Sequence, residues 1–177
     1  MDAAAAKAAG AETMVVGVVN PGGTLPDHWV GSIVAALEAG LDVAAGLHRK
    51  LADVPAIAAA AERTGRAILD VRHSRESFST GKGTKRPGKR LLTVGTDCSI
   101  GKKYTALALE KGMREAGLDA AFRATGQTGV FISGRGVAID AVVADFISGA
   151  AEWLTPANAP DHWDVVEGQG SLFHPSF

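Results

Sequence analysis

Short apolar runs alternate along this chain with stretches in which apolar residues recur every three or four positions. Continuous runs are typical of strands buried on both faces, whereas the spaced residues are typical of one face of a helix. The expected strands are residues 14–19, 41–45, 67–71, 91–94, 119–123 and 164–167, and the expected helices are 27–40, 53–63, 101–116 and 137–154. Strands that alternate with helices predict parallel sheets and an α/β fold.

A polar segment divides this alternation into two series. Residues 74–89 contain Ser, Thr, Gly and Pro together with five Lys or Arg side chains. Such a composition is typical of a solvated, mobile linker, and the alternative is a basic flap that covers an anionic ligand. We therefore expect a first domain over residues 1–73, a basic linker over 74–89 and a second domain over 90–177.

Charge and composition narrow the classes of partner. The net charge is −1, so no global field favours nucleic acid or an anionic membrane surface. No apolar run approaches the roughly 20 residues that a membrane-spanning helix needs. The single cysteine, Cys98, excludes an intrachain disulfide and fits a reducing cytoplasm. We expect a cytoplasmic protein that binds a small molecule rather than nucleic acid or a membrane.

The strand expected at 91–94 is followed by the sequence GTDCSIGK, which starts at Gly95. This is the pattern of a P-loop: a glycine, four residues, a second glycine and a lysine. The backbone N–H groups of such a loop wrap a phosphate, and the following helix directs its positive end at the same anion. The predicted phosphate-binding residues are Gly95, Thr96, Asp97, Cys98, Ser99, Ile100, Gly101, Lys102 and Lys103.

One position departs from the P-loop pattern. The Ser or Thr that normally follows the lysine, and whose hydroxyl ligates magnesium, is replaced by Lys103. The replacement weakens the case for Mg-ATP hydrolysis but leaves phosphate binding intact, so we assign no metal-ligating residue. Cys98, inside the loop, is either a reactive thiol or simply a small loop residue.

The last expected strand ends in an acidic residue, Glu167, and a glycine-rich turn follows it. In P-loop folds such a strand lies near the phosphate loop, and its acid holds magnesium or orients a water molecule. Glu167 is therefore the candidate catalytic residue, and the alternative is a turn acid satisfied by neighbouring N–H groups.

Polar residues at and after the strand expected at 119–123 are candidates for binding a substrate. Amide, hydroxyl and guanidinium groups suit a polar or anionic molecule, and Arg suits carboxylate in particular. The alternative is a flexible glycine loop with solvated arginines. The candidate residues are Arg123, Gln127, Thr128 and Arg135.

The second series is short for a P-loop sheet, which usually has about five strands, because only three are expected here. We therefore expect a C-terminally truncated P-loop domain, and we expect the first domain to lack its opening strand and helix. A sheet left with an open edge favours homo-oligomers or aggregation.

Several segments resemble a family long labelled as a domain of unknown function, whose best-described members are the DgcN-type D-glutamate N-acetyltransferases. The segments are GTDCSIGKKYTALAL, RATGQTGVFISGRGVAIDAVVADFISGAAEWL and DVVEGQGSLFHPSF, with NPGGTLPDHW and AGLDVAAGLH upstream. The resemblance implies a Rossmann-like domain followed by a P-loop domain with three α/β/α layers. It also implies acetyl transfer from acetyl-coenzyme A to the amino group of a D-amino acid, with D-glutamate as the expected substrate.

Acyl transfer is therefore the leading functional hypothesis, with Glu167 as general base toward the substrate amine. The phosphate loop also resembles that of dethiobiotin synthetases. That likeness leaves an ATP- and magnesium-dependent ligase or kinase of a small carboxylate as the alternative. A third hypothesis is a non-catalytic nucleotide-binding module. The three differ in whether acetyl-coenzyme A or Mg-ATP binds, and in whether turnover follows.

Overall fold

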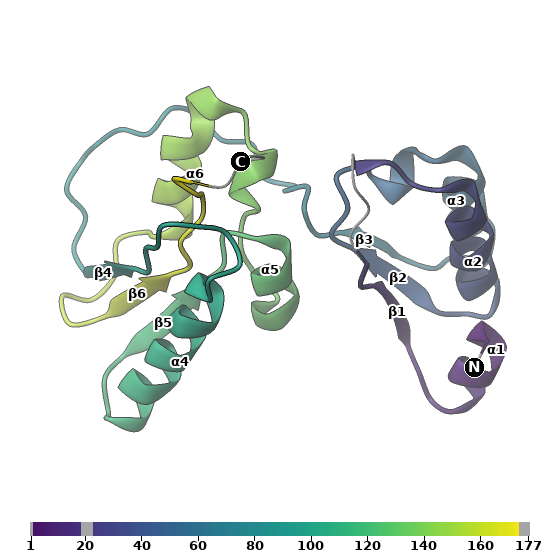
Figure 1. Cartoon of the computed structure of the whole chain (residues 1–177), viewed down its shortest axis with the longest axis horizontal. Helices are drawn as coiled ribbons and strands as arrows, with labels where there is room; N and C mark the ends of the chain where they lie inside the picture. Colours follow the sequence, from purple (N-terminus) through teal and green to yellow (C-terminus); the bar gives the residue numbers. More distant parts are fainter. Residues whose placement is uncertain (1, 19–22, 174–177) are drawn as a thin grey trace. The chain divides into compact units, whose positions relative to one another are not determined.

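The computed structural model describes residues 2–18 and 23–173 of the chain. The chain divides after His73 into two compact units (Figure 1). Each unit contains an open parallel sheet with helices beside it, so the predicted α/β class is confirmed. Within the described ranges, no helix is long and apolar enough to cross a membrane.

The first unit has a three-stranded parallel sheet in the order β1-β2-β3. Its elements are α1 (Ala3–Ala8), β1 (Thr13–Val16), α2 (Asp27–Glu38), β2 (Asp42–Ala45), η2 (Leu51–Asp53), α3 (Pro55–Thr64) and β3 (Ile68–Asp70). Ile33 and Leu37 from α2, Val43 from β2 and Ile57 from α3 are at most 2% exposed and pack in one core. Burying each such side chain contributes roughly 1.5–3 kcal/mol, so this core holds the helices on the sheet.

The second unit places its last strand in the middle of its sheet, in the order β4-β6-β5, with both pairings parallel. Its elements are β4 (Lys89–Leu92), α4 (Lys102–Glu115), β5 (Ala120–Arg123), α5 (Gln127–Ser133), η3 (Ile139–Ala141), η4 (Ala144–Phe146), α6 (Ile147–Leu154) and β6 (Trp163–Val166). Because β4 leads into the P-loop and β6 leads into Glu167, this order brings the two predicted motifs to the same edge of the sheet.

Helices α4 and α6 lie on opposite sides of this sheet (Figure 1), which gives three layers. Under α4, the buried residues Ala106, Ala120 and Val165 form a small core. Leu91 and Phe122 are partly buried against it. Alternate residues of β6 therefore face α4, and the residues between them point to the other face of the sheet.

The helix expected over residues 137–154 is correct only in its second half, where α6 forms. Before α6 the chain makes two short 3₁₀ turns instead, η3 and η4. The amide of Val137 donates to the carbonyl of Ala124, and the amide of Ile139 donates to the carbonyl of Thr125. These bonds hold the segment beside β5, and Ala138, Val142 and Val143 have extended rather than helical backbone angles, so a continuous helix does not form here.

The six predicted strands are present among the described residues, with their ends shifted. The strand expected at 14–19 ends at Val16; Val18 is 51% exposed, and Val19 lies outside the described residues. The strand expected at 91–94 ends at Leu92, and Val94 is 80% exposed. Apolar residues alone therefore overstate how far the strands extend, since the ladder also needs a partner for each amide.

The segment read as a basic linker lies against α6 rather than free in solvent. The amide of Gly81 donates to the Ser148 hydroxyl at 2.9 Å. The amides of Lys82 and Gly83 donate to the two carboxylate oxygens of Glu152 at 2.9 and 2.8 Å. These donors, followed by the charge of Arg86, lower the pKa of Glu152. Ordered contacts of this kind fix residues 79–83 on the second unit.

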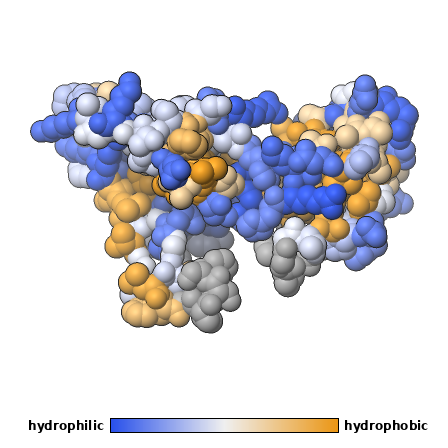
Figure 2. Space-filling model, turned by 90° about the horizontal axis from the view of Figure 1, so that it is seen from above, coloured by the Kyte–Doolittle hydropathy of each residue, from blue (hydrophilic) through white to orange (hydrophobic). Residues whose placement is uncertain are grey.

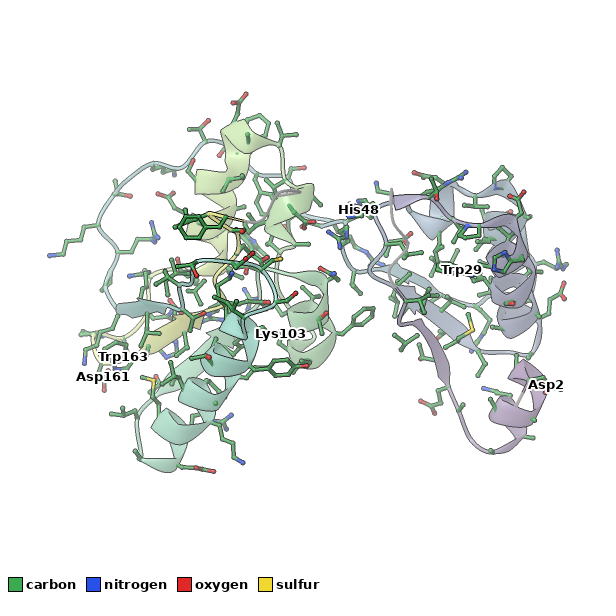
Figure 3. All side chains as sticks on the ribbon, in the orientation of Figure 1. Asp2, Trp29, His48, Lys103, Asp161 and Trp163 are labelled. Atoms are coloured by element: carbon green, nitrogen blue, oxygen red, sulfur yellow. The ribbon has the colours of Figure 1, made fainter. Side chains whose placement is uncertain are left out.

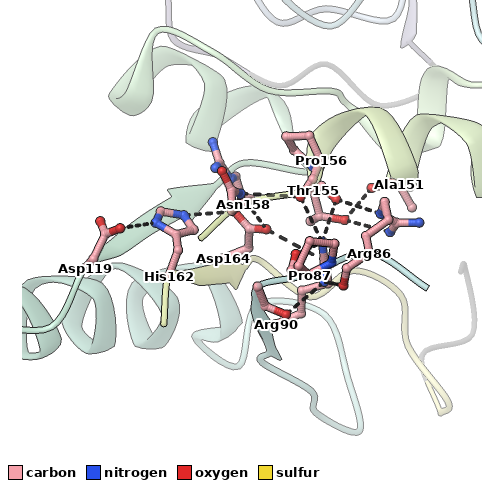
Figure 4. Close-up of polar contacts among 12 residues, drawn as sticks. Arg86, Pro87, Arg90, Asp119, Ala151, Thr155, Pro156, Asn158, His162 and Asp164 are labelled. Carbon is pink, nitrogen blue, oxygen red and sulfur yellow. Dashed lines mark hydrogen bonds and ion pairs between the residues drawn. The ribbon is translucent and has the colours of Figure 1, made fainter. Parts of the chain in front are cut away.

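A buried carboxylate organises the face of the sheet away from α4 (Figure 4). Asp164 is 0% exposed, and its oxygens lie 2.6 Å from Arg123 Nε and 3.9 Å from Arg90 Nε. His162 Nε2 lies 3.4 Å away, and His162 Nδ1 reaches Asp119 at 2.8 Å. A buried charge requires such partners, because leaving it unpaired in the interior costs several kcal/mol.

Arg90 links this carboxylate to the chain that follows α6. Its guanidinium donates to the carbonyls of Thr155 at 3.1 Å and Pro156 at 2.8 Å. It also donates to the carbonyl of Arg86 at 3.1 Å. The ion pair at Asp164 therefore fastens three separate segments to one face of the sheet.

We predict that Asp164→Asn lowers the free energy of unfolding of the second unit by about 3 kcal/mol or more, because two arginines lose their buried counter-charge. The control Asp119→Asn removes a carboxylate whose side chain is 63% exposed, and it should cost less than about 1 kcal/mol. Urea unfolding followed by tryptophan fluorescence in a Trp29→Phe background reports on Trp153 and Trp163 of the second unit. Equal losses in the two variants would contradict the structural role of Asp164.

Candidate phosphate-binding site

The phosphate loop connects β4 to α4 and is held in an unusual backbone conformation. Ser99 has φ of 57° and is the one non-glycine residue with positive φ in the described part of the chain. Gly101, the residue before α4, has φ of 101°. For a non-glycine residue such as Ser99 this angle costs energy and persists only where the surroundings enforce it, and such residues are concentrated at ligand-binding sites. The first amides of α4 follow directly, as phosphate binding requires.

The loop is tied to the turn after β6. The amide of Gly168 donates to the Thr93 hydroxyl at 3.0 Å, and the amide of Leu172 donates to the carbonyl of Thr96 at 3.0 Å. A side chain at Gly168 would place its Cβ 1.7 Å from the Thr93 carbonyl oxygen. Glycine is therefore needed at this position for the two segments to touch.

Lys102 crosses from one of these segments to the other. Its ammonium donates to the carbonyl of Asp97 at 2.5 Å and to that of Gly170 at 2.8 Å. The carboxylate of Asp97 accepts from the Cys98 amide at 2.7 Å and from the Ser171 hydroxyl at 2.9 Å. The motif residues thus form a connected polar network around the loop.

A groove of about 270 Å³ lies beside the loop and is lined by residues of β4, of the loop and of α4. Its lining residues are Leu91, Leu92, Thr93, Val94, Ile100, Lys102, Thr105 and Leu109. Leu92, Val94 and Ile100 are each more than half exposed. Figure 2 shows hydrophobic residues on the surface of the second unit in orange. The phosphate loop therefore has a hydrophobic neighbour as well as charged ones.

Glu167 follows β6 and is 5% exposed. Its Oε2 accepts hydrogen bonds from the amides of Thr125 at 3.0 Å and Gly126 at 3.3 Å. Burial raises the pKa of Glu167, while these two amides, the charge of Lys103 and the Gln169 amide oppose the rise. The carboxyl group is consequently a stronger base than an exposed glutamate.

Two glycines allow α5 to approach Glu167. A Cβ at Gly129 would lie 2.4 Å from Glu167 Oε2, and one at Gly126 would lie 3.3 Å from Oε1. Thr125 also belongs to this cradle, since its hydroxyl donates to the Glu167 carbonyl at 2.6 Å. The segment is therefore partly a short helix, α5, and not the flexible glycine loop of the alternative interpretation. Closely spaced glycines in a sequence can indicate close packing as well as flexibility.

The candidate substrate residues do not all gather at this site. Gln127 and Thr128 begin α5, next to the Glu167 cradle, and Thr128 is exposed. Arg135 is exposed after α5, with its guanidinium 5.3 Å from the centre of the Trp153 ring. Arg123 instead points to the face of the sheet away from α4, where its pair with Asp164 leaves it 15% exposed. Its guanidinium is thus already matched to a carboxylate of the chain itself.

Both halves of the chain match known families. Residues 1–74 match the family described as "Domain of unknown function (DUF1611_N) Rossmann-like domain". Residues 77–177 match "Domain of unknown function (DUF1611_C) P-loop domain". The chain belongs to the DUF1611 family. This confirms the family predicted from the motifs, and its order of a Rossmann-like and then a P-loop domain.

Two curated relatives of the DUF1611 chain carry the name D-glutamate N-acetyltransferase. One, from Tritonibacter scottomollicae, is 56% identical over 172 residues, which are 97% of this chain and 52% of the relative. The other, from a Pseudoalteromonas species, is 55% identical over 168 residues, which are 95% of this chain and 51% of the relative.

A crystal structure of a DUF1611 family protein from Anabaena variabilis has the same fold. Its TM-score is 0.87 at 39% identity, and the match covers 99% of this chain and 51% of that one. The DUF1611 chain therefore spans about half the length of the relatives that it matches.

Magnesium, which P-loop folds usually hold, would need oxygen ligands at this site. In the DUF1611 chain a cation, Lys103, stands where the hydroxyl ligand is expected. The Oε2 atom of Glu167 already accepts two N–H groups. The hydroxyl ligand of the usual magnesium site is therefore replaced by a cation, and the nearby carboxylate is already hydrogen-bonded through one oxygen, so this donor set fits magnesium poorly.

We predict that Glu167 makes the stability of the DUF1611 chain depend on pH. In the unfolded chain this carboxyl ionises near its ordinary value of 4.5, and in the folded chain it ionises at higher pH. Between the two pKa values the unfolded state has released a proton that the folded state keeps. Raising the pH through this window therefore lowers the stability of the wild type relative to Glu167→Gln.

Urea unfolding of both proteins across pH ~4 to ~8 measures this difference. The control Glu115→Gln removes a carboxylate on α4 whose side chain is 67% exposed. A wild type that gains stability over Glu167→Gln as the pH rises would contradict the burial effect.

Proposed function

We propose that the phosphate loop of the DUF1611 chain binds a phosphate group of acetyl-coenzyme A. We propose further that the protein to which it belongs transfers the acetyl group to the amino group of D-glutamate or a similar D-amino acid. The observation that carries this proposal is the combination of a P-loop between β4 and α4, with Lys102 at the start of α4, and curated relatives named for that activity. Coenzyme A carries a pyrophosphate, so a P-loop suits it without any hydrolysis.

The chemistry assigned to the site is aminolysis of a thioester. The amine nitrogen attacks the acetyl carbonyl carbon, the carbon–sulfur bond breaks, and coenzyme A leaves as the thiolate. Glu167, as general base, accepts a proton from the nitrogen, and its raised pKa makes it better suited to do so. Gln127 and Thr128 are proposed to bind the amino acid. For its carboxylate we propose Arg135 rather than Arg123, since Arg123 is already paired with Asp164.

The alternative ligand is Mg-ATP, as in a carboxylate ligase or kinase. Lys103 argues against it, because this residue replaces the magnesium-binding hydroxyl. We place the reaction in the cytoplasm, where a chain with a single free cysteine remains reduced.

We expect acetyl-coenzyme A at ~100 times its dissociation constant to stabilise the chain by roughly 2.7 kcal/mol in a thermal-shift titration. Lys102→Ala should remove most of this stabilisation, whereas Lys111→Ala, a lysine with 76% exposure on the same helix, should leave it unchanged. Release of coenzyme A thiol in the presence of D-glutamate should fall about 10²- to 10⁴-fold in Glu167→Gln, with the affinity for acetyl-coenzyme A retained.

The outcomes separate the candidate functions. Stabilisation by Mg-ATP alone would favour the ligase. Binding of acetyl-coenzyme A with no thiol release, even when D-glutamate and L-glutamate are both supplied, would leave a binding module. A Lys102→Ala protein that still binds acetyl-coenzyme A normally would show that the phosphate loop is not part of the binding site.

We also propose that the chain forms homo-oligomers through the open edge of β4. This strand ends the sheet, and Leu92 and Val94 beside that edge are 57% and 80% exposed. Unpaired strand edges with apolar side chains are templates for association. Val94→Lys should therefore weaken concentration-dependent association in sedimentation velocity, whereas Leu118→Lys, at an exposed position after α4, should not. A wild type that is monomeric at all concentrations would contradict this proposal.

A further inference from the structure

Two successive lysines begin α4, where a P-loop normally has one lysine and a hydroxyl residue. The ammonium of Lys102 is bonded to the carbonyls of Asp97 and Gly170. Figure 3 places Lys103 at the same end of α4, and its ammonium lies 4.7 Å from the centre of the Tyr104 ring. Lys103 thus occupies the helix position of the usual magnesium-binding hydroxyl residue, and its ammonium is free to turn toward a ligand on the loop only by leaving the exposed Tyr104 ring.

The groups around Glu167 include hydrogen-bond donors, which a carboxylate can use in place of a metal ion. Two backbone amides donate to Oε2, at 3.0 and 3.3 Å. Burial raises the pKa of Glu167, and the charge of Lys103 acts in the opposite direction. A divalent cation bound to Glu167 would compete with the amides for Oε2, and the positive charge of Lys103 would repel it.

We propose that this site binds a pyrophosphate without a divalent cation, and that the Lys103 ammonium takes the place of the magnesium ion. The proposal rests on the proposed function, in that the loop must hold a phosphate-bearing ligand. It goes further by naming the ligand class as a pyrophosphate with an ester on both phosphates, as in coenzyme A, in preference to a nucleoside triphosphate.

The preference for a pyrophosphate over a triphosphate follows from the number of negative charges that the two lysines must balance. A doubly esterified pyrophosphate carries one negative charge on each phosphate, and Lys102 and Lys103 supply one positive charge each. A triphosphate tail carries roughly four negative charges, because its terminal phosphate is nearly doubly ionised. Two lysines leave about half of that charge without a counter-ion, and metal ions normally supply the remainder at phosphate sites. A magnesium ion bound to the tail would in turn approach Lys103 as a like charge.

The test is isothermal titration of the chain with coenzyme A and with ATP, each in EDTA and in excess magnesium. Wild type should bind coenzyme A with the same dissociation constant in both buffers, and more tightly than ATP. Lys103→Met should weaken coenzyme A binding about ten- to a hundredfold in both buffers, since a charge-assisted contact is lost. Lys103→Thr restores the usual hydroxyl, so it should weaken binding in EDTA and allow magnesium to improve the binding of ATP.

Lys111→Met, on the exposed surface of α4, is the matched control and should behave as wild type. Loss of coenzyme A binding by wild type in EDTA would overturn the inference without any variant, and so would unchanged binding by a folded Lys103→Met protein. Either result would leave the phosphate assignment standing if Lys102→Ala still abolishes binding. A wild type that binds neither ligand in either buffer would overturn the proposed function, and this inference with it.

Discussion

The parallel pairing of β4 with β6 is the contact on which the candidate site depends. The register sets Leu92 opposite Val166, and the Thr93 amide continues the ladder to the Val166 carbonyl at 3.1 Å. Because both strands end at the same level, the phosphate loop and Glu167 leave the sheet side by side. The contact between Gly168 and Thr93 then fixes how close the two turns approach. A change in this register would move a whole set of side chains to the other face and separate the two motifs.

The phosphate loop could be predicted from sequence because its chemistry requires fixed spacing within one short segment. Glu167 could be found for a similar reason, as an acid at the end of an apolar strand. The cradle around Glu167 could not be predicted in this way. It depends on Gly126 and Gly129, whose closeness to the carboxylate arises from the path of α5 and not from local sequence. The family could be predicted because its motifs are specific. The contacts that position these motifs could not, because they join residues far apart in the sequence.

The burial of Asp164 could not be predicted from the pattern of polar and apolar residues along its strand. A charged residue at the start of an apolar run suggests a solvated end, yet Asp164 is completely buried. The sheet register sets it opposite Arg90 on one neighbour, and its carboxylate reaches Arg123 on the other. Two arginines from separate strands therefore balance one aspartate, and no part of the sequence near Asp164 contains this information. The same pairing explains why Arg123, a reasonable substrate ligand by residue type, is occupied within the fold.

The length of coenzyme A, the proposed ligand, constrains the role proposed for Glu167. Its pantetheine arm has about as many backbone bonds as four residues, which span roughly 13–14 Å when extended. The Thr93 hydroxyl contacts both the Lys102 carbonyl and the Gly168 amide, so Glu167 lies beside the phosphate loop. With a phosphate on the loop, an extended arm carries the thioester away from Glu167, and only a bent arm returns it. A base role thus requires the arm to fold back along the protein. An extended arm would instead leave Glu167 beside the phosphate end of the ligand. In the first case removing the carboxylate slows turnover, and in the second it changes affinity.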